Sequence, residues 1–246
     1  MSNKTIIEVE DLTMAYSDQP VLWDNDVSIV ENSKTAIIGP NGAGKSTFLK
    51  GILGLLPTLS GSAHFMGKAY KEVQAEIAYI PQSSEVNWDF PTTALDVVLM
   101  GRYVHLGWIK RPSQKDKKIA EQALAQIGMS EFKNRQISQL SGGQKQRVFI
   151  ARAIAQDANI YIMDEPLAGV DKNTESIIMD FLNESQKQGK TSVVVHHDLN
   201  TLAEYFDHLV IINKRIVAQG KMTKVLTQEN LENANMNGDY GLDVSV

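Results

Sequence analysis

The chain has 246 residues, 43% of them hydrophobic, which allows one well-packed domain with room for an inserted subdomain. Its formal net charge of -5 argues against a protein whose main task is to coat nucleic acid, so no nucleic-acid partner is expected. The lack of cysteine excludes disulfide bonds and thiolate metal sites and suits a reducing compartment.

The sequence shows neither a secretory signal nor a membrane-spanning stretch. Charged residues interrupt the first eleven positions, namely Lys4, Glu8, Glu10 and Asp11. No apolar run approaches the roughly 20 residues that are needed to cross a bilayer. We therefore expect the protein to stay where it is made and to reach a membrane only through a partner.

Strand and helix patterns alternate along most of the chain. In the first third, strands are predicted at residues 6–12, 27–30, 34–38, 61–66 and 76–80, with a helix at 46–55. The pattern then becomes helical, with two helices between residues 92 and 128 around a loop at 107–112. In the last part, helices are predicted at 141–155, 174–188 and 199–205, strands at 161–163 and 191–195, and a hairpin at 209–213 and 215–219.

This alternation predicts an α/β fold with a mostly parallel sheet and helices on both of its faces. The helical block between Gln82 and Leu140 interrupts the alternation, so we interpret it as an inserted subdomain. Past Met222 the sequence becomes polar, and a frayed helix followed by a tail is expected there.

A glycine-rich run stands between the predicted strand 34–38 and the predicted helix 46–55, which is the setting of a phosphate-binding P-loop. Its glycines let the main chain fold into a nest of amide protons, Lys45 adds a charge for the terminal phosphates, and the Ser46 hydroxyl can coordinate Mg²⁺. A nucleoside triphosphate is the expected ligand, although the loop alone does not separate a kinase from a GTPase or a transport motor. The candidate ATP-binding residues here are Gly39, Pro40, Asn41, Gly42, Ala43, Gly44, Lys45, Ser46 and Thr47.

An apolar segment, residues 160–163, ends in two acids that are followed by Pro166. Asp164 is expected to hold Mg²⁺, and Glu165 to face the attacking water as the catalytic base. Because Pro166 ends the strand, the two neighbouring carboxylates can diverge toward different targets. An acidic turn after a core strand carries little information alone, but the preceding P-loop favours the catalytic interpretation.

A short polar segment, Ser141, Gly142, Gly143 and Gln144, follows Leu140 and precedes a predicted helix. Ser141 and Gln144 have the spacing of a capping box, so the segment could simply be a well-made helix start. Its amides, glycines and positive helix terminus also make an anion-binding surface. A chain with its own P-loop has no obvious need of a second phosphate contact, unless that contact serves the nucleotide of a second subunit.

The order of a P-loop, an LSGGQ segment and a strand ending in Asp-Glu resembles the ATP-binding cassette (ABC) ATPases along essentially the whole chain. The resemblance implies that Gln82 belongs to a glutamine loop that links Mg²⁺ to the helical subdomain and that His197 is the switch histidine. It further implies that Tyr16 stacks on adenine and that residues 168–171 form the D-loop. One of several mild departures is His196, which replaces a common threonine.

The resemblance also implies a domain organisation. The chain would be a single ABC ATPase domain over residues 1–246, with a P-loop NTPase core that includes an N-terminal antiparallel β subdomain. The nucleotide-binding core would comprise residues 1–83 and 146–220, the inserted helical subdomain with the LSGGQ signature residues 84–145, and the C-terminal helix and tail residues 221–246.

In ABC ATPases two cassettes pair head to tail, so the resemblance implies a homodimer with two ATP molecules between the chains. Each P-loop would face the LSGGQ segment of the other chain. During hydrolysis Glu165 would polarise the attacking water, His197 would stabilise the transferring group, and Lys45 with Mg²⁺ would neutralise its charge.

The segment at residues 85–108 is unusually aromatic for a region just beyond the glutamine loop. Some of its rings are expected in the subdomain core, and an exposed remainder would be a socket for a partner helix. In importers of this family that surface receives a helix of an integral membrane permease, and residues 88–112 are similar to cassettes for manganese, zinc and iron uptake. We therefore expect a metal-import ATPase at the cytoplasmic face of the membrane, served indirectly by an extracytoplasmic metal-binding protein.

Three alternatives stay open at this point. A chromosome-maintenance or DNA-repair ATPase also carries LSGGQ, but normally with a very long coiled coil that does not fit in this chain. A translation-associated cassette protein usually has two cassettes in one chain. A P-loop kinase would need a pocket for its acceptor and would leave the LSGGQ segment unexplained.

Overall fold

The computed structural model of the chain describes residues 4–16, 19–107 and 110–236. The chain forms two compact units. The first unit comprises Met1–Val73 and Gly189–Val246, and the second unit comprises Gln74–Gln188. The α/β fold class predicted from the sequence is confirmed, with an antiparallel N-terminal sheet and mostly parallel pairing among the remaining strands.

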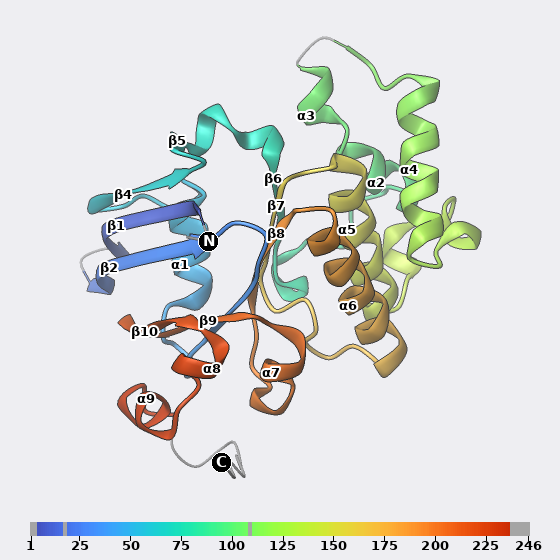
Figure 1. Cartoon of the computed structure of the whole chain (residues 1–246). Coiled ribbons are helices and arrows are strands. Elements are labelled where there is room, and N and C mark those ends of the chain that lie inside the picture. The colour runs from blue at the N-terminus through green and yellow to red at the C-terminus, as the bar shows by residue number, and fades with distance from the viewer. Residues whose placement is uncertain (1–3, 17–18, 108–109, 237–246) are drawn as a thin grey trace. The chain divides into compact units, whose positions relative to one another are not determined.

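The N-terminal sheet of the first unit is antiparallel and has the strand order β2-β1-β4-β5 (Figure 1). Its strands are β1 (Thr5–Tyr16), β2 (Gln19–Val30), β4 (Ser60–Phe65) and β5 (Lys68–Ala69). β1 and β2 are much longer than the sequence predicted. The two strands continue through register shifts, and Asp11 and Asp24 take left-handed conformations with φ of 51° and 54°. These irregularities let polar residues interrupt the apolar pattern without ending either strand.

The second sheet of the first unit carries the strand that leads to the P-loop. β3 (Lys34–Ile38) lies between β8 (Thr191–Val195) and β9 (His208–Asn213) and is parallel to both. β10 (Arg215–Lys221) pairs antiparallel with β9. Every residue of β3 and β8 is buried, as expected for parallel strands that are covered on both faces. Because β3 and β8 are parallel, their carboxyl ends lie at the same edge of the sheet.

The helices of the first unit are short. α1 (Lys45–Ile52) follows the P-loop and stops earlier than predicted, because the chain turns at Gly54 with φ of 63°. A 3₁₀ turn, η1 (Tyr70–Glu72), follows β5, and η6 (Leu199–Thr201) continues into α7 (Leu202–Tyr205).

The segment after β10 is ordered rather than frayed. It forms α8 (Met222–Val225) and α9 (Gln228–Asn233). Apolar side chains of this segment are buried, namely Met222, Val225, Leu231, Ala234 and Met236. The expected tail beyond residue 236 lies outside the described residues. The burial of these apolar residues outweighs the polar composition from which fraying was predicted.

The second unit combines a parallel strand pair with five helices among its described residues. β6 (Ile77–Ile80) pairs in parallel with β7 (Ile160–Met163). The helices are α2 (Ala94–Met100), α3 (Tyr103–Leu106), α4 (Gln114–Gln126), α5 (Gly142–Gln156) and α6 (Lys172–Lys187). Four 3₁₀ turns complete the unit, η2 (Gln74–Glu76), η3 (Ser83–Glu85), η4 (Ser130–Phe132) and η5 (Ile137–Gln139). α5 is central because it packs against α2, α4, α6 and β6.

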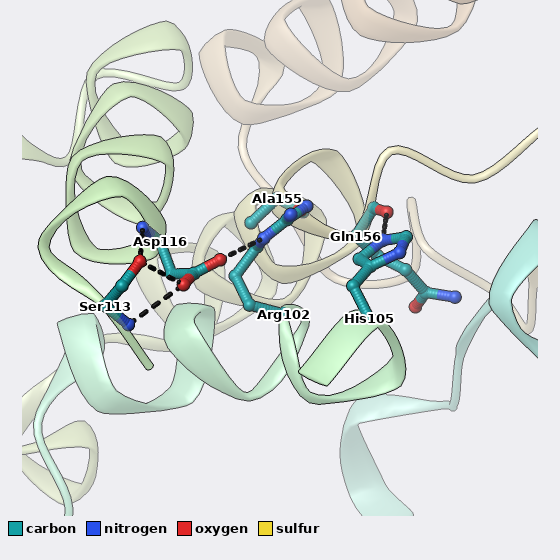
Figure 2. A network of polar contacts seen from close by, with 6 residues as sticks. All are labelled: Arg102, His105, Ser113, Asp116, Ala155 and Gln156. Carbon is teal, nitrogen blue, oxygen red and sulfur yellow. Dashed lines mark hydrogen bonds and ion pairs between the residues drawn. The ribbon is translucent and has the colours of Figure 1, made fainter. Parts of the chain in front are cut away.

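A polar network joins three helices of the second unit (Figure 2). The Arg102 side chain lies between α4 and the end of α5, where it donates to Asp116 Oδ1 at 3.2 Å and to the carbonyl oxygen of Ala155 at 2.7 Å. The second oxygen of Asp116 accepts bonds from the main-chain N–H and the hydroxyl of Ser113, which closes the capping box of α4. Only 15% of the Arg102 side chain and 9% of the Asp116 side chain are exposed, so solvent screens this ion pair weakly.

Close backbone contact at the corner between α2 and α3 reinforces this network. A Cβ atom on Gly101 would lie 2.3 Å from the carbonyl oxygen of Arg152, so only glycine allows this approach to α5. His105 Nε2 lies 2.7 Å from the carbonyl oxygen of Gln156, as Figure 2 shows. The corner is therefore fixed to the last turn of α5 on both sides of Arg102.

We expect Asp116→Asn to lower the Tm by roughly 2–6 °C at pH 7, because an amide cannot replace the charge-assisted hydrogen bonds to Asp116. Bonds from Ser113, and then from Arg102, lower the pKa of Asp116 from 3.8 to about 2. The stabilising contribution is therefore fully present above about pH 3.8 and is lost as the pH falls through about 2. Calorimetry should give the same Tm difference from the wild type at about pH 5 and about pH 7.

Glu121→Gln is the matched control, because Glu121 pairs with Lys133 on the surface, where the two side chains are 37% and 42% exposed. It should change the Tm by about 1 °C or less. Equal effects of the two variants, or an Asp116→Asn effect that disappears between pH 7 and pH 5, would contradict this prediction.

Candidate functional site

The P-loop follows β3 directly, and its main chain takes a path that only glycine permits at two positions. A Cβ atom on Gly39 would lie 2.0 Å from the carbonyl oxygen of Ile212. Gly44 is the N-cap of α1 and has φ of 95°, and a Cβ there would lie 2.5 Å from Leu22 Cδ2. The glycines predicted from the sequence are therefore required by the fold of the loop itself.

The loop presents positive charge at the start of α1. Gly44, the N-cap residue of α1, has no side chain to cap the first turn, and a helix start of this kind is positively polarised and attracts anions. Lys45 is only 8% exposed, and its Nζ donates to the carbonyl oxygens of Gly39 at 2.8 Å and Pro40 at 3.1 Å. These contacts hold the ammonium group over the loop. Amides and an ammonium group in this arrangement suit the phosphates of a nucleotide.

Two histidines stand at the end of β8, at the same sheet edge as the P-loop. His196 is 3% exposed, and its main-chain N–H donates to the carbonyl oxygen of Ile37 in β3 at 3.0 Å. His197 follows with an exposed side chain. The predicted switch histidine is thus the accessible member of the pair, while its neighbour belongs to the interior of the first unit.

In the second unit, Gln82 and Glu165 are brought together. Gln82 follows β6 and Glu165 follows β7, and the Gln82 side chain donates through Nε2 to Glu165 Oε2 at 2.9 Å. Glu165 has φ of 49°, a left-handed conformation that is uncommon for a residue with a side chain. This turn separates Glu165, which is half-buried, from Asp164, which is fully buried. The predicted divergence of the two carboxylates is therefore achieved by the main chain at Glu165.

Asp164 lies in an interior environment that is electrostatically distinctive. Its main-chain N–H donates to the carbonyl oxygen of Ile80 at 2.9 Å, which extends the pairing of β7 with β6 by one residue. Burial raises the pKa of Tyr79, and the negative charges of Asp164 and then Glu85 raise it further. The Tyr79 phenol therefore stays protonated next to the buried Asp164 side chain.

The LSGGQ segment forms the start of α5 and has the predicted capping box. Ser141 Oγ accepts from the Gln144 N–H at 3.3 Å, and Gln144 Oε1 accepts from the Ser141 N–H at 3.0 Å. Ser141 and Gly142 are exposed, and a Cβ atom on Gly142 would meet open space. The cap therefore accounts for Ser141 and Gln144. It does not account for Gly142, because none of the described residues lies close enough to require glycine there.

The LSGGQ segment also approaches the residues that resemble a D-loop. A Cβ atom on Gly143 would lie 3.2 Å from Asp171 Oδ2 and 3.2 Å from Thr174 Oγ1. Asp171 caps α6 by accepting from the Thr174 N–H at 2.9 Å and from its hydroxyl at 3.0 Å. These bonds, the main-chain bond first, hold the pKa of Asp171 below its ordinary value. A charged carboxylate is therefore fixed next to the glycines of the segment.

The aromatic segment after Gln82 divides into buried and exposed rings. Trp88 packs edge-on against Phe149 of α5 at 5.1 Å and donates through Nε1 to the carbonyl oxygen of Ser83 at 2.9 Å. Lys145 Nζ lies 5.1 Å from the centre of the Trp88 ring. Other apolar side chains are exposed, namely Phe90, Met100, Tyr103 and Val104, and we call these four residues the apolar patch. Trp108 lies outside the described residues.

The predicted site residues fall into one group in the first unit and two groups in the second. The first unit brings the P-loop and His197 to one sheet edge, and the second brings together Gln82 and Glu165, beside Asp164, and separately forms the LSGGQ cap. The Tyr16 main chain pairs with Gln19, but its side chain lies outside the described residues. Sequence reasoning missed the Arg102–Asp116 pair, although the Ser113-x-x-Asp116 spacing signals its capping box.

Comparisons with known proteins agree on one family. The ABC transporter family model matches residues 22–168. The chain is 53% identical over 228 residues to the zinc transport system ATP-binding protein TroB of Treponema pallidum (strain Nichols), covering 93% of this chain and 86% of that protein. It is 52% identical over 226 residues to the manganese transport system ATP-binding protein MntB of Bacillus subtilis (strain 168), covering 92% and 90% respectively.

A solved structure of an ATP-binding cassette of an ABC transporter in its ADP conformation has the same fold. It superimposes with a TM-score of 0.80 at 25% identity, covering 96% of this chain and 100% of that one. None of the helices in the described ranges has the length and apolar character required to cross a membrane. The family match covers more than half of the chain and the relatives cover most of it, so this protein belongs to the ABC transporter family as one of its ATP-binding, ATP-hydrolysing subunits.

Proposed function

We propose that this subunit powers the import of divalent metal ions, with Mn²⁺, Zn²⁺ and Fe²⁺ as the candidate substrates, through a separate membrane permease. The observation that carries the ATPase part is the polar cluster at the end of each buried strand, the P-loop after β3 and Glu165 after β7. The names of the relatives carry the metal part, because TroB is a zinc and MntB a manganese transport protein.

We propose that two copies of the chain form a head-to-tail homodimer with ATP between them. The support is the LSGGQ segment, whose exposed Gly142 has no steric reason within its own chain. Close approach of a nucleotide held by a second copy would supply that reason. Each P-loop would then face Ser141, Gly142, Gly143 and Gln144 of the other copy, where the start of α5 adds a positive helix terminus.

In the reaction that we propose, Glu165 accepts a proton from the water that attacks the γ-phosphate. Its hydrogen bond to Gln82 holds the carboxylate in one orientation, so a displacement of Gln82 would change the orientation of the base. Lys45 neutralises charge on the phosphates, and the exposed imidazole of His197 donates to the transferring group. Main-chain N–H groups within residues 41–47 bind the remaining phosphate oxygens.

The oxygen donors proposed for Mg²⁺ fit that ion. They are the Ser46 hydroxyl, the Gln82 amide and the buried Asp164 carboxylate, which are hard ligands of the kind that Mg²⁺ prefers. The described residues hold no cluster of three or more acids or histidines suited to a metal, which agrees with an ion bound chiefly by nucleotide phosphates and water. When bound, Mg²⁺ would neutralise charge that develops on the phosphates.

We further propose a division of the chain into three parts. The nucleotide-binding core would comprise residues 1–83 and 146–220, the helical subdomain residues 84–145 and the C-terminal part residues 221–246. Tyr16 would stack on adenine. An extracytoplasmic metal-binding protein would deliver the ion to the permease.

The apolar patch of Phe90, Met100, Tyr103 and Val104 is the surface that we propose for the permease. These side chains are 61%, 43%, 49% and 43% exposed, and the Arg102 network fixes the corner that carries the last three. A rigid apolar surface suits a short helix of a membrane subunit. Docking there would place the chain at the cytoplasmic face of the membrane as a peripheral subunit.

Glu165→Gln should lower the steady-state rate of ATP hydrolysis by roughly 10²- to 10⁴-fold, because the amide keeps the shape and the Gln82 contact but loses the base. ATP-dependent dimers should accumulate, which light scattering with Mg²⁺ and ATP would detect. Glu131→Gln, at an exposed position of the same unit, is the control and should behave as the wild type. Unchanged hydrolysis in Glu165→Gln would reject the role assigned to Glu165.

The double variant Phe90→Ser with Tyr103→Ser should weaken binding of the chain to permease-containing membranes by about 10-fold or more, since both aromatic side chains of the apolar patch are removed. ATP binding by the isolated chain should stay unchanged. The matched control is Leu59→Ser, which removes an apolar side chain that is 65% exposed in the first unit. Equal membrane binding by both proteins would place the permease contact elsewhere.

Metal import is tested with vesicles whose membrane holds the permease. The chain is enclosed inside the vesicles, and the loaded metal-binding protein is added outside. Mn²⁺ or Zn²⁺ should stimulate ATP hydrolysis and accumulate in the vesicles, and Glu165→Gln should abolish both effects. ATP hydrolysis that drives another solute and ignores these ions would overturn the metal assignment while leaving the ATPase assignment intact.

A further inference from the structure

The buried residue His196 makes a side-chain contact that the proposed reaction does not use. Its Nε2 lies 2.8 Å from Oγ1 of Thr201, the last residue of η6. The Thr201 hydroxyl donates its proton to the carbonyl oxygen of Asp198 at 3.2 Å. The Thr201 hydroxyl thus bridges His196 Nε2 and the carbonyl oxygen of Asp198. The strand end and the next turn are thereby joined through two consecutive hydrogen bonds.

These two hydrogen bonds hold the residues on both sides of His197. Before it, His196 is fixed by the bond from its N–H to Ile37 and by its ring, which lies 5.4 Å from the centre of the Phe206 ring. After it, Asp198 accepts from Thr201 through its carbonyl group and from the Asn200 N–H, at 3.0 Å, through its carboxylate. The segment from residue 196 to residue 201 is a closed turn with His197 on its exposed side.

We infer that His196 and Thr201 are positioning residues for His197. The inference rests on the proposed function, in which His197 donates to the transferring phosphoryl group. An exposed imidazole on an unrestrained loop would sample many orientations. Restricting these orientations before the reaction lowers the conformational entropy that is lost on reaching the transition state. The bond between His196 and Thr201 restricts the main chain on both sides of His197, and so restricts where its imidazole can lie.

Histidine at position 196 has a physical reason in this geometry. The residue must be buried next to aromatic rings and must also carry a polar atom that reaches a hydroxyl five positions further along the chain. An imidazole meets both requirements, because it packs as a flat ring and presents a hydrogen-bonding nitrogen at its far edge. A purely structural role would stabilise the first unit without affecting catalysis, so the two roles are separable by experiment.

The test uses Thr201→Val in the full chain, because valine keeps the shape and removes the hydroxyl. We expect kcat for ATP hydrolysis to fall by roughly 5- to 20-fold with less than about a 2-fold change in KM, since positioning acts on the transition state and not on ATP binding. Thr201→Ser restores the hydroxyl and should keep wild-type kcat. Thr201→Ala is the second variant, should the valine side chain prevent folding.

A double-mutant cycle with His197→Ala separates positioning from stability. If Thr201 acts through His197, then Thr201→Val should have no further effect on kcat once His197 is alanine. An additive loss in that background, or a wild-type kcat in both Thr201→Val and Thr201→Ala, would overturn the inference. If His197→Ala itself leaves kcat unchanged, then the role proposed for His197 fails, which is a different outcome from failure of the positioning.

Discussion

When a buried parallel strand ends, the main-chain N–H and C=O groups that follow it still need hydrogen-bond partners. β3, β7 and β8 are all of this kind, since every residue in them is buried. β3 ends in the amides of the P-loop, β7 in Asp164 and Glu165, and β8 in His196 and its bond to Ile37. The polar groups at these strand ends are of the kinds that bind phosphate, water and a cation. In each unit candidate site residues therefore lie directly after a buried strand.

A sharp turn directly after a buried strand requires an unusual main-chain conformation. This chain makes such turns with two kinds of residue. At the P-loop it uses glycine, as at Gly44 with φ of 95°. At Glu165 it uses a residue with a side chain in a left-handed conformation, φ 49°, where glycine would relieve strain but would lack the carboxylate that we propose as the base. The hydrogen bond from Gln82 contacts that carboxylate. The strained position is thus the one that carries the proposed base.

Sequence patterns predicted the buried strands well because apolar runs bounded by glycine or acids leave few alternatives; the predicted ranges 34–38 and 191–195 coincide with β3 and β8. They failed where bulges carry polar residues inside a strand, as at Asp11 and Asp24, and where short polar helices bury a few apolar residues, as at Met222. The candidate site residues could be proposed from the sequence, because the P-loop and LSGGQ motifs depend on local spacing. The His196–Thr201 bond depends on a turn six residues long whose geometry no local pattern specifies.

In two pairs of neighbouring residues, the side chain with a proposed direct role is exposed and the side chain that holds the main chain is covered. His197 is exposed and His196 beside it is buried; Tyr103 is exposed and Arg102 beside it is largely covered. In each pair the covered side chain reaches across to a second element, Thr201 in one case and Asp116 with the end of α5 in the other. A covered polar group is screened weakly by solvent, so its hydrogen bonds hold the main chain more firmly than the same bonds would at the surface. The exposed neighbour gains a fixed position while its own side chain remains free to meet a ligand or a partner.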